Sequence, residues 1–141
     1  MARQEVATAA SVAIGGVAVL AAAAVLSPSA MSGGPDLCPF RRMTGLPCPA
    51  CGLTRSWVSF AHGDVSAAFG YNLFGPVFMA VALVATVVAV WVLVTGRPAL
   101  DRLGARLTGR IAAGVLLVWF GYGLVRLLFA ANDWGLFPSV T

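Results

Sequence analysis

The chain has 141 residues, of which 60% are hydrophobic and 10% charged, and its mean hydropathy is +0.90. A soluble domain carries roughly 25% charged and 45–50% apolar residues, and a chain this short has too little interior to hide the apolar surplus. This composition excludes a soluble globular protein and a disordered tail. The net charge of +4 comes from arginines scattered between apolar runs, which argues against nucleic-acid binding. The sequence therefore predicts a membrane protein whose main partner is the lipid bilayer.

Three stretches are apolar over the length that a helix needs to cross a bilayer, about 20 residues. They run from Val6 to Leu26, from Leu73 to Thr95 and from Ile111 to Ala131. Backbone amides in lipid must be paired within their own segment, so these stretches are expected to be helices. The first is longer than the roughly 7–15 apolar residues of a signal peptide, and Pro28 disfavours cleavage behind it. We expect an all-α integral membrane protein with three transmembrane helices, residues 1–141 forming one domain.

Two features inside the spans carry further expectations. Ala7, Ser11 and Gly15 recur every four residues in the first span, a spacing that favours close helix packing in lipid. Arg126 stands in the outer third of the third span, where we expect its side chain to snorkel to the headgroups. The alternative is that Arg126 faces the bundle and pairs with Asp64, Asn72 or an anionic partner group.

The arginines near the span ends predict the orientation of the chain. The short connection between the second and third spans has one acid, Asp101, against four arginines: Arg97, Arg102, Arg106 and Arg110. The longer segment 27–64 has three arginines: Arg41, Arg42 and Arg55. Because cytoplasmic loops are enriched in basic residues, the short connection and the N-terminus are expected in the cytoplasm. The segment 27–64 and the C-terminal residues 132–141 then lie outside the inner or plasma membrane.

The segment between the first two spans carries the chemistry. Five of the eight prolines fall between Pro28 and Pro49, which predicts a loop rather than regular structure. All three cysteines, Cys38, Cys48 and Cys51, lie in it or at its edge. Since cysteines used only as small core residues would also occur in the long apolar runs, their gathering in one loop indicates sulfur chemistry.

A short helix is expected directly after the cysteines. Leu53, Trp57 and Phe60 are spaced by four and three residues and share one helical face. An amphipathic helix with such residues suits the membrane interface. Gly63 is expected to end it, and Asp64 to cap the helix that follows.

The residues of this segment form a sequence pattern that resembles the pattern of a known protein family. It consists of Cys38-Pro39, the string Thr44-Gly45-Leu46-Pro47-Cys48-Pro49-Ala50-Cys51-Gly52-Leu53-Thr54-Arg55, then Gly63-Asp64 and Tyr71-Asn72. The pattern resembles domain-of-unknown-function family 2752, a family of small bacterial membrane proteins, over residues 37 to about 95. Leu73 stands where that family usually has proline. The resemblance implies a membrane topology and a cysteine motif, supported by Thr54, Arg55, Asp64 and Asn72, and it implies no activity.

Three interpretations of the cysteines stay open at this point. In an oxidising compartment, Cys38 could form a disulfide with Cys48 or Cys51, contributing about 3 kcal/mol in the chain-entropy model. The Cys48/Cys51 spacing is also half of a tetrahedral metal site, which Cys38 and His62 could complete for zinc or copper(I). His62 is the weak ligand, because about three helical turns, roughly 16 Å, separate it from Cys51.

The third interpretation is a membrane thiol–disulfide oxidoreductase that uses the Cys48/Cys51 pair. Cys51 near a helix N-terminus, with Arg55 close by, is expected to favour the thiolate. Such enzymes generally need a second pair, which the chain lacks. No catalytic residue is assigned, since the acids are far apart in sequence and Gly52 replaces the histidine of a haem-attachment motif. We expect a non-catalytic accessory component. Because three thin helices enclose little interior, we also expect it to form a homo-oligomer or join a larger membrane assembly.

Overall fold

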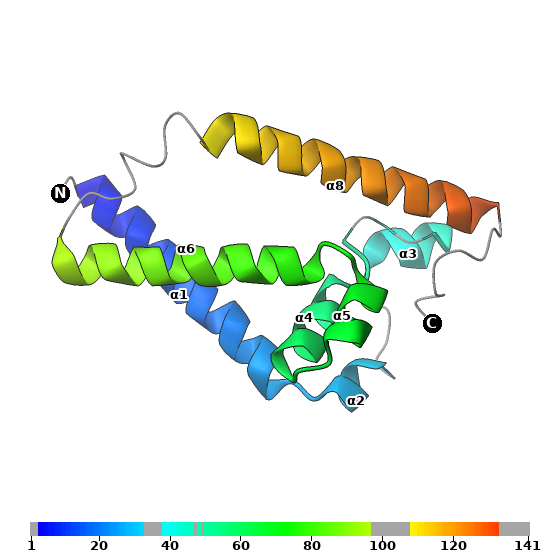
Figure 1. Cartoon of the computed structure of the whole chain (residues 1–141), viewed down its shortest axis with the longest axis horizontal. Coiled ribbons are helices and arrows are strands. Elements are labelled where there is room, and N and C mark those ends of the chain that lie inside the picture. Colours follow the sequence, from blue (N-terminus) through cyan, green and yellow to red (C-terminus); the bar gives the residue numbers. More distant parts are fainter. Residues whose placement is uncertain (1–2, 33–37, 47, 49, 97–107, 133–141) are drawn as a thin grey trace.

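The computed structural model describes residues 3–32, 38–46, 48, 50–96 and 108–132, without the side chains of Arg41, Thr108 and Arg110. Of these residues 84% are helical and none is in a strand. Figure 1 shows the long helices α1 (Arg3–Val25), α6 (Gly75–Thr95) and α8 (Thr108–Ala131). Four short helices stand between α1 and α6 in the sequence: α2 (Pro28–Ser32), α3 (Pro39–Thr44), α4 (Leu53–Ala61) and α5 (Val65–Tyr71). The expectation of a loop without regular structure between Pro28 and Pro49 is wrong for α2 and α3, because each of these helices begins at a proline, where the missing N–H costs no helical hydrogen bond.

The three predicted spans are confirmed as helices. Arg3–Val25, Gly75–Thr95 and Ile111–Ala131 are each long and apolar enough to cross a membrane. Their ends differ from the predicted ones by three residues or fewer. Pro76 lies in the first turn of α6, where its missing N–H costs no helical hydrogen bond. The chain is therefore an all-helical protein with three candidate membrane spans.

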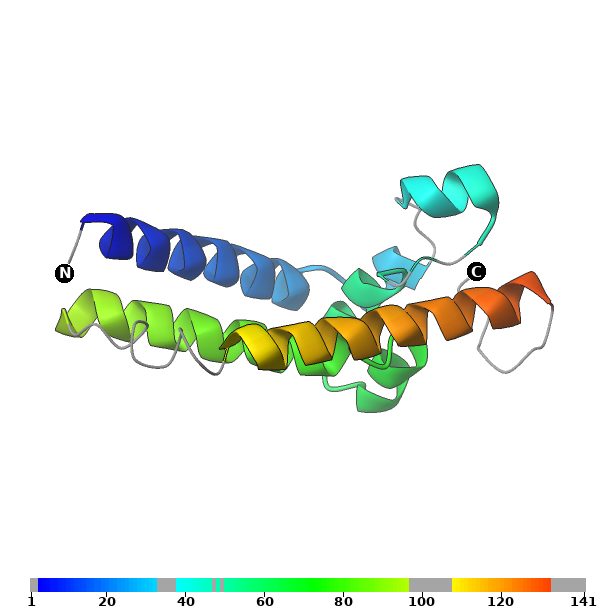
Figure 2. The ribbon, with the colours of Figure 1, turned by 90° about the horizontal axis from the view of Figure 1, so that it is seen from above.

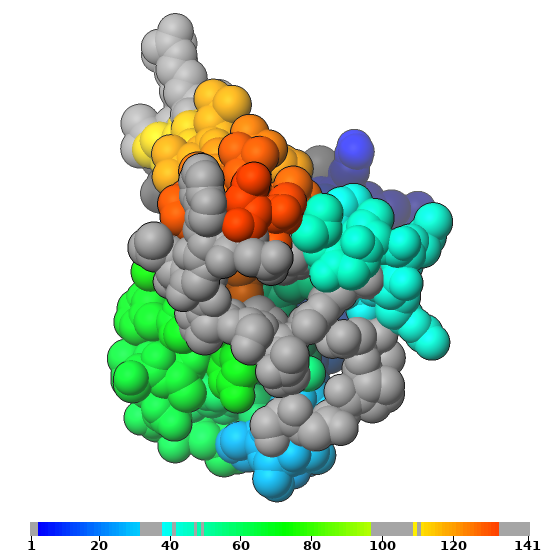
Figure 3. Space-filling model, turned by 90° about the vertical axis from the view of Figure 1, so that its right-hand side faces the viewer, coloured from blue at the N-terminus to red at the C-terminus, as the bar shows by residue number. Residues whose placement is uncertain are grey.

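The short helices gather at one end of the long ones. The N-terminus of α1 and the C-terminus of α6 lie together at the opposite end (Figures 1 and 2). Viewed from the short-helix end, α2, α3 and α5 and the last turns of α8 share one surface (Figure 3). The arginine-rich connection is represented only by Arg110, in the first turn of α8, because residues 97–107 lie outside the described residues.

α1 packs along α6 through small residues. On α1 the buried positions are Ala9, Ala13 and Ala23, and a Cβ on Gly16 would run into the side chain of Thr86 on α6. Ala7, Ser11 and Gly15 are exposed, so the face that packs within the described part of the chain is a different one, and the packing of these three residues against another helix stays a prediction. Alanine and glycine occur all round this helix, so their spacing could not select the face that packs.

α8 reaches α6 through large side chains instead. The ring centroids of Phe74 and Tyr122 are 5.4 Å apart, as are those of Phe78 and Trp119. These separations are typical of favourable aromatic pairs. The two α8 residues of these pairs, Trp119 and Tyr122, lie near the middle of the helix.

The predicted turn between α4 and α5 is confirmed. Gly63 has φ 84°, a left-handed conformation that glycine adopts without strain. The Asp64 carboxylate then accepts a hydrogen bond of 2.9 Å from the backbone N–H of Ala67 and caps α5.

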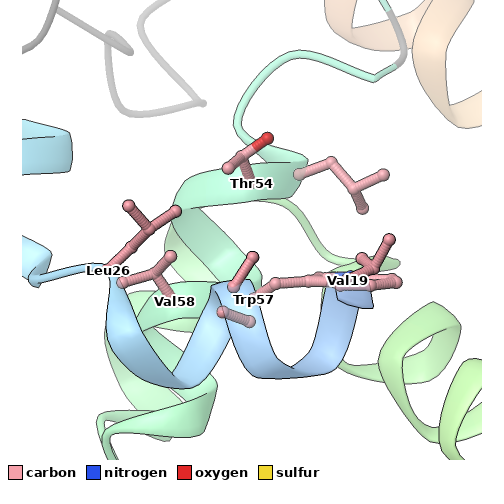
Figure 4. Close-up of a pocket in the computed structure, with 8 residues that line it drawn as sticks. Val19, Leu26, Thr54, Trp57 and Val58 are labelled. Atoms are coloured by element: carbon pink, nitrogen blue, oxygen red, sulfur yellow. The ribbon is translucent and has the colours of Figure 1, made fainter. Parts of the chain in front are cut away.

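The predicted amphipathic helix exists as α4, but part of its apolar face has a protein neighbour. Leu53 and Trp57 line an apolar cavity of about 210 Å³ between α4 and the end of α1. Figure 4 shows Trp57 and Val58 of α4 alongside Val19 and Leu26. The other side of α4 is buried through Ser56 and Ser59, and Ser56 lies so close to Gly75 at the start of α6 that a Cβ on Gly75 would collide with it. α4 is thereby fixed against both α1 and α6.

Candidate metal centre

The three predicted cysteines come together in space. Cys38 precedes α3, while Cys48 and Cys51 lie in the turn that leads into α4. The Sγ atom of Cys48 is 3.3 Å from that of Cys38 and 3.2 Å from that of Cys51. All three Sγ atoms lie within 4.8 Å of one another, and none of the cysteines is in a disulfide. We call these three residues the cysteine cluster.

The turn from Cys48 to Cys51 is shaped by its own backbone. The N–H of Cys51 donates to the carbonyl of Cys48 at 3.0 Å, and the N–H of Cys48 donates to the Sγ of Cys51 at 3.2 Å. Gly52 follows with φ 83°. A Cβ at this position would collide with the carbonyl oxygen of Tyr71. The turn therefore needs glycine twice over, for its conformation and for its closeness to the end of α5.

The carbonyl oxygen of Cys51 joins the cluster to two buried side chains. It accepts hydrogen bonds from Nδ2 of Asn72 at 3.2 Å and from Nη1 of Arg126 at 3.0 Å. Asn72 is 0% exposed and Arg126 is 3% exposed. One oxygen thus connects the cysteine turn with the α5–α6 junction and with α8.

Asn72 satisfies its own polar atoms in this position. Its Oδ1 accepts from the N–H of Phe74 at 3.0 Å, and its backbone N–H closes α5 on the carbonyl of Ala68. Its backbone carbonyl accepts from the Ser56 hydroxyl at 3.5 Å. A fully buried asparagine with each group paired fixes one local structure, because an unpaired group there would be costly.

The expectation that Arg126 snorkels to the headgroups is wrong. Its side chain turns into the protein, as the alternative stated, but the acceptor is a backbone carbonyl rather than Asp64 or Asn72. The reason is tertiary: the acceptor, Cys51, lies 75 residues earlier in the chain. Neither the position of Arg126 in the third span nor the hydropathy of that span predicts a contact of this kind.

The other predicted residues do not join the cluster. His62 is exposed at the C-terminal end of α4, with Nδ1 2.9 Å from the carbonyl oxygen of Val58. Asp64 caps α5, Thr54 lines the cavity against α1, and Arg55 is half-buried on α4. In the part of the chain that the structure describes, the metal-ligand group consists of the three cysteines alone.

The low thiol pKa expected for Cys51 is also wrong. Burial raises the pKa of Cys51 from 9.0 to about 12, and the neighbouring thiol of Cys48 adds to the effect. The helix N-terminus and Arg55 were expected to favour the thiolate, but loss of water and crowding by sulfur outweigh them. Cys51 in the metal-free cluster is therefore a neutral thiol at physiological pH.

This raised pKa predicts slow alkylation. In reduced, metal-free protein, Cys51 should react slowly with iodoacetamide at pH 8, and its rate should rise by about tenfold per pH unit above pH 9, following the thiolate fraction. Because the folded pKa exceeds the unfolded value of 9.0, stability from this group is full below pH 9 and falls as pH rises toward 12. Peptide mapping at several pH values checks the rate. Alkylation at pH 7 as fast as that of the unfolded chain contradicts it.

Comparison with protein families agrees with the cysteine pattern. Residues 38–86 match the family described as Protein of unknown function (DUF2752), which confirms the resemblance. The match takes in the cysteine cluster, α4, α5 and the first half of α6, and it leaves out α1 and α8. No curated protein and no solved structure matches the chain. The family description names no activity, so the cysteine cluster is the feature that indicates a function.

Proposed function

We propose that the cysteine cluster binds one thiophilic metal ion, zinc or copper(I). The chain is then a single-domain, non-catalytic membrane component whose short-helix end is organised by that ion. The supporting observation is the convergence of three Sγ atoms within 4.8 Å. Zinc bonds thiolate sulfur at about 2.3 Å, which separates sulfurs around one ion by about 3.8 Å. The described side chains need only small rotations to reach this arrangement.

The cluster suits a metal better than redox chemistry. A disulfide uses two sulfurs, whereas here Cys48 has a sulfur neighbour on either side at nearly equal distance. A redox nucleophile needs a lowered pKa, and burial raises the pKa of Cys51. A bound metal cation instead favours the deprotonated thiolate, because ligation of the metal removes the thiol proton.

Metal analysis of the whole chain tests the proposal. Protein purified in mild detergent without chelator should contain about one zinc or copper per chain, with all three thiols protected from alkylation until chelator is added. Cys48→Ser should lose the metal, because the central sulfur is removed. His62→Ala is the matched control and should keep it, since His62 lies outside the cluster.

Two results would contradict the metal proposal. Metal-free protein whose intact mass is lower by two hydrogen atoms would indicate one disulfide and one free thiol, and mapping would show which pair had closed. Metal-free protein with three freely reactive thiols would contradict both the metal site and the disulfide.

We also propose that the cysteine cluster lies on the extracytoplasmic side of the bacterial inner or plasma membrane. The support is the arginine bias of segment 97–110 and the placement of the N-terminus of α1 at the end opposite the cluster. A fluorescent protein fused to the N-terminus should be bright, and one fused to the C-terminus should be dark. Alkaline phosphatase should be active only when it is fused to the C-terminus. The reverse pattern would invert the orientation. Association with further copies or with a larger assembly stays a prediction.

A further inference from the structure

Arg126 is a buried cation beside the cysteine cluster. Its guanidinium is 3% exposed and bonds the carbonyl oxygen of Cys51. In the described part of the chain no carboxylate pairs with it, because Asp64 caps α5 and Glu5 lies in the first turns of α1, at the far end. A charge removed from water is costly unless an opposite charge lies near, and most of all inside a membrane protein. Among the described residues no negative charge offsets the Arg126 cation, so an anion formed at the cysteine cluster would stabilise it.

The metal-loaded cluster supplies such a charge. Three thiols are neutral, whereas three thiolates around one divalent ion carry a net charge of minus one. We propose that Arg126 is the counter-charge of the thiolate cluster, so that the cluster with a divalent ion and the guanidinium together are neutral. This inference rests on the proposed metal site and adds a residue from α8, which the family match does not include.

The geometry brings the two charges within effective range. Arg126 donates to the main-chain carbonyl oxygen of Cys51 at 3.0 Å, and four bonds, about 5 Å at most, separate that oxygen from the Cys51 Sγ, so Nη1 lies within about 8 Å of the sulfur. At such distances in a partly buried site, one charge pair is worth about tenfold to fiftyfold in ion affinity. By linkage, the bound ion stabilises the docking of α8 by the same factor.

Zinc affinity of single-charge variants tests the proposal. The full-length protein in detergent is titrated with zinc in competition with a chromophoric chelator. Arg126→Gln should weaken zinc binding by about tenfold or more. The matched control Arg42→Gln removes an exposed cation from α3 at the same end, and its effect should stay within about threefold because exposed charges are screened.

A lysine variant separates charge from side-chain shape. Arg126→Lys keeps the charge and loses the forked donor, so its zinc affinity should stay within about threefold of the wild type. A loss in the lysine variant as large as in the glutamine variant would overturn the proposal. This comparison remains decisive if the glutamine variant does not fold, because a lysine variant that folds and binds zinc tenfold more weakly gives the same negative answer.

Thermal melting with and without zinc separates a counter-charge from a structural hydrogen bond. Arg126→Gln should melt no lower than the wild type without metal, since it removes a buried cation, and should melt lower with zinc bound. Equal lowering in both forms would overturn the inference and indicate a structural contact only. If the wild type binds zinc and R126Q binds it equally well, the inference alone fails. Wild type that binds copper(I) but no zinc overturns the inference, which is stated for a divalent ion, and leaves the proposed function standing. Wild type that binds neither metal overturns both.

Discussion

Gly52→Ala should remove the cysteine cluster and lower stability by about 3–5 kcal/mol, one of the largest effects of any single substitution in this chain. Gly52 has φ 83°, which is strained for alanine, and the new Cβ would meet the carbonyl oxygen of Tyr71. The colliding atom belongs to the backbone at the end of α5, so it cannot move aside as a flexible side chain would. Melting temperature in detergent and metal content after purification measure the loss.

Gly63→Ala is the matched control for this substitution. Gly63 has φ 84°, almost the same backbone conformation, but nothing lies within 4 Å of its added Cβ. Its cost is the left-handed conformation alone, about 1–2 kcal/mol. The difference between the two variants therefore measures the contact of the cysteine turn with α5. Equal losses would mean that this contact is absent.

Asn72→Leu should lower stability by about 3–5 kcal/mol, because the side chain is 0% exposed and its removal leaves buried polar groups unpaired. The N–H of Phe74 loses its acceptor, and the carbonyl oxygen of Cys51 keeps only Arg126. Leucine has a similar volume, so lost hydrogen bonds dominate the effect rather than a cavity.

Asn132→Leu is the control for the asparagine substitution. Asn132 also donates from Nδ2 to a backbone carbonyl, that of Leu128 at 2.8 Å, but it is exposed at the end of α8. Water replaces that partner, so the change in stability should stay within about 0.5 kcal/mol. A loss as large as that of Asn72→Leu would show that burial is not the source of the effect. Thermal melting of both variants in the same detergent measures the two changes in stability.

Local patterns were sufficient to predict the three long helices, α4 and the meeting of the cysteines, but not the short helices α2 and α3. Hydrophobic length gave the three spans, and the Gly63-Asp64 pair gave the turn and the cap of α5, because each depends on neighbours in the sequence. The crowding of all cysteines into one loop indicated that their sulfurs would meet, as they do.

Features that depend on distant contacts could not be predicted in the same way. The packing face of α1 is set by Thr86 on α6, and the direction of Arg126 by a carbonyl in another segment. The prediction of a low pKa for Cys51 failed for a related reason, because burial of the thiol and its closeness to Cys48 and Cys38 arise only when the chain folds. Asn72 was named as a motif residue and as a possible partner of Arg126, and nothing local indicated that it would bond Cys51.

The attachment of α8 is uneven along its length. Trp119, Tyr122 and Arg126 in its middle and second half contact other parts of the protein, whereas the described side chains between Ile111 and Val118 are exposed. About 27 Å of helix separate Arg126 from Thr108 at 1.5 Å per residue. If the protein spans the bilayer, lipid chains surround this helix in one leaflet while protein contacts guide it in the other. The position of the first turns of α8 is then set by the lipid of that leaflet, whereas its second half is positioned by protein contacts from Trp119 onward.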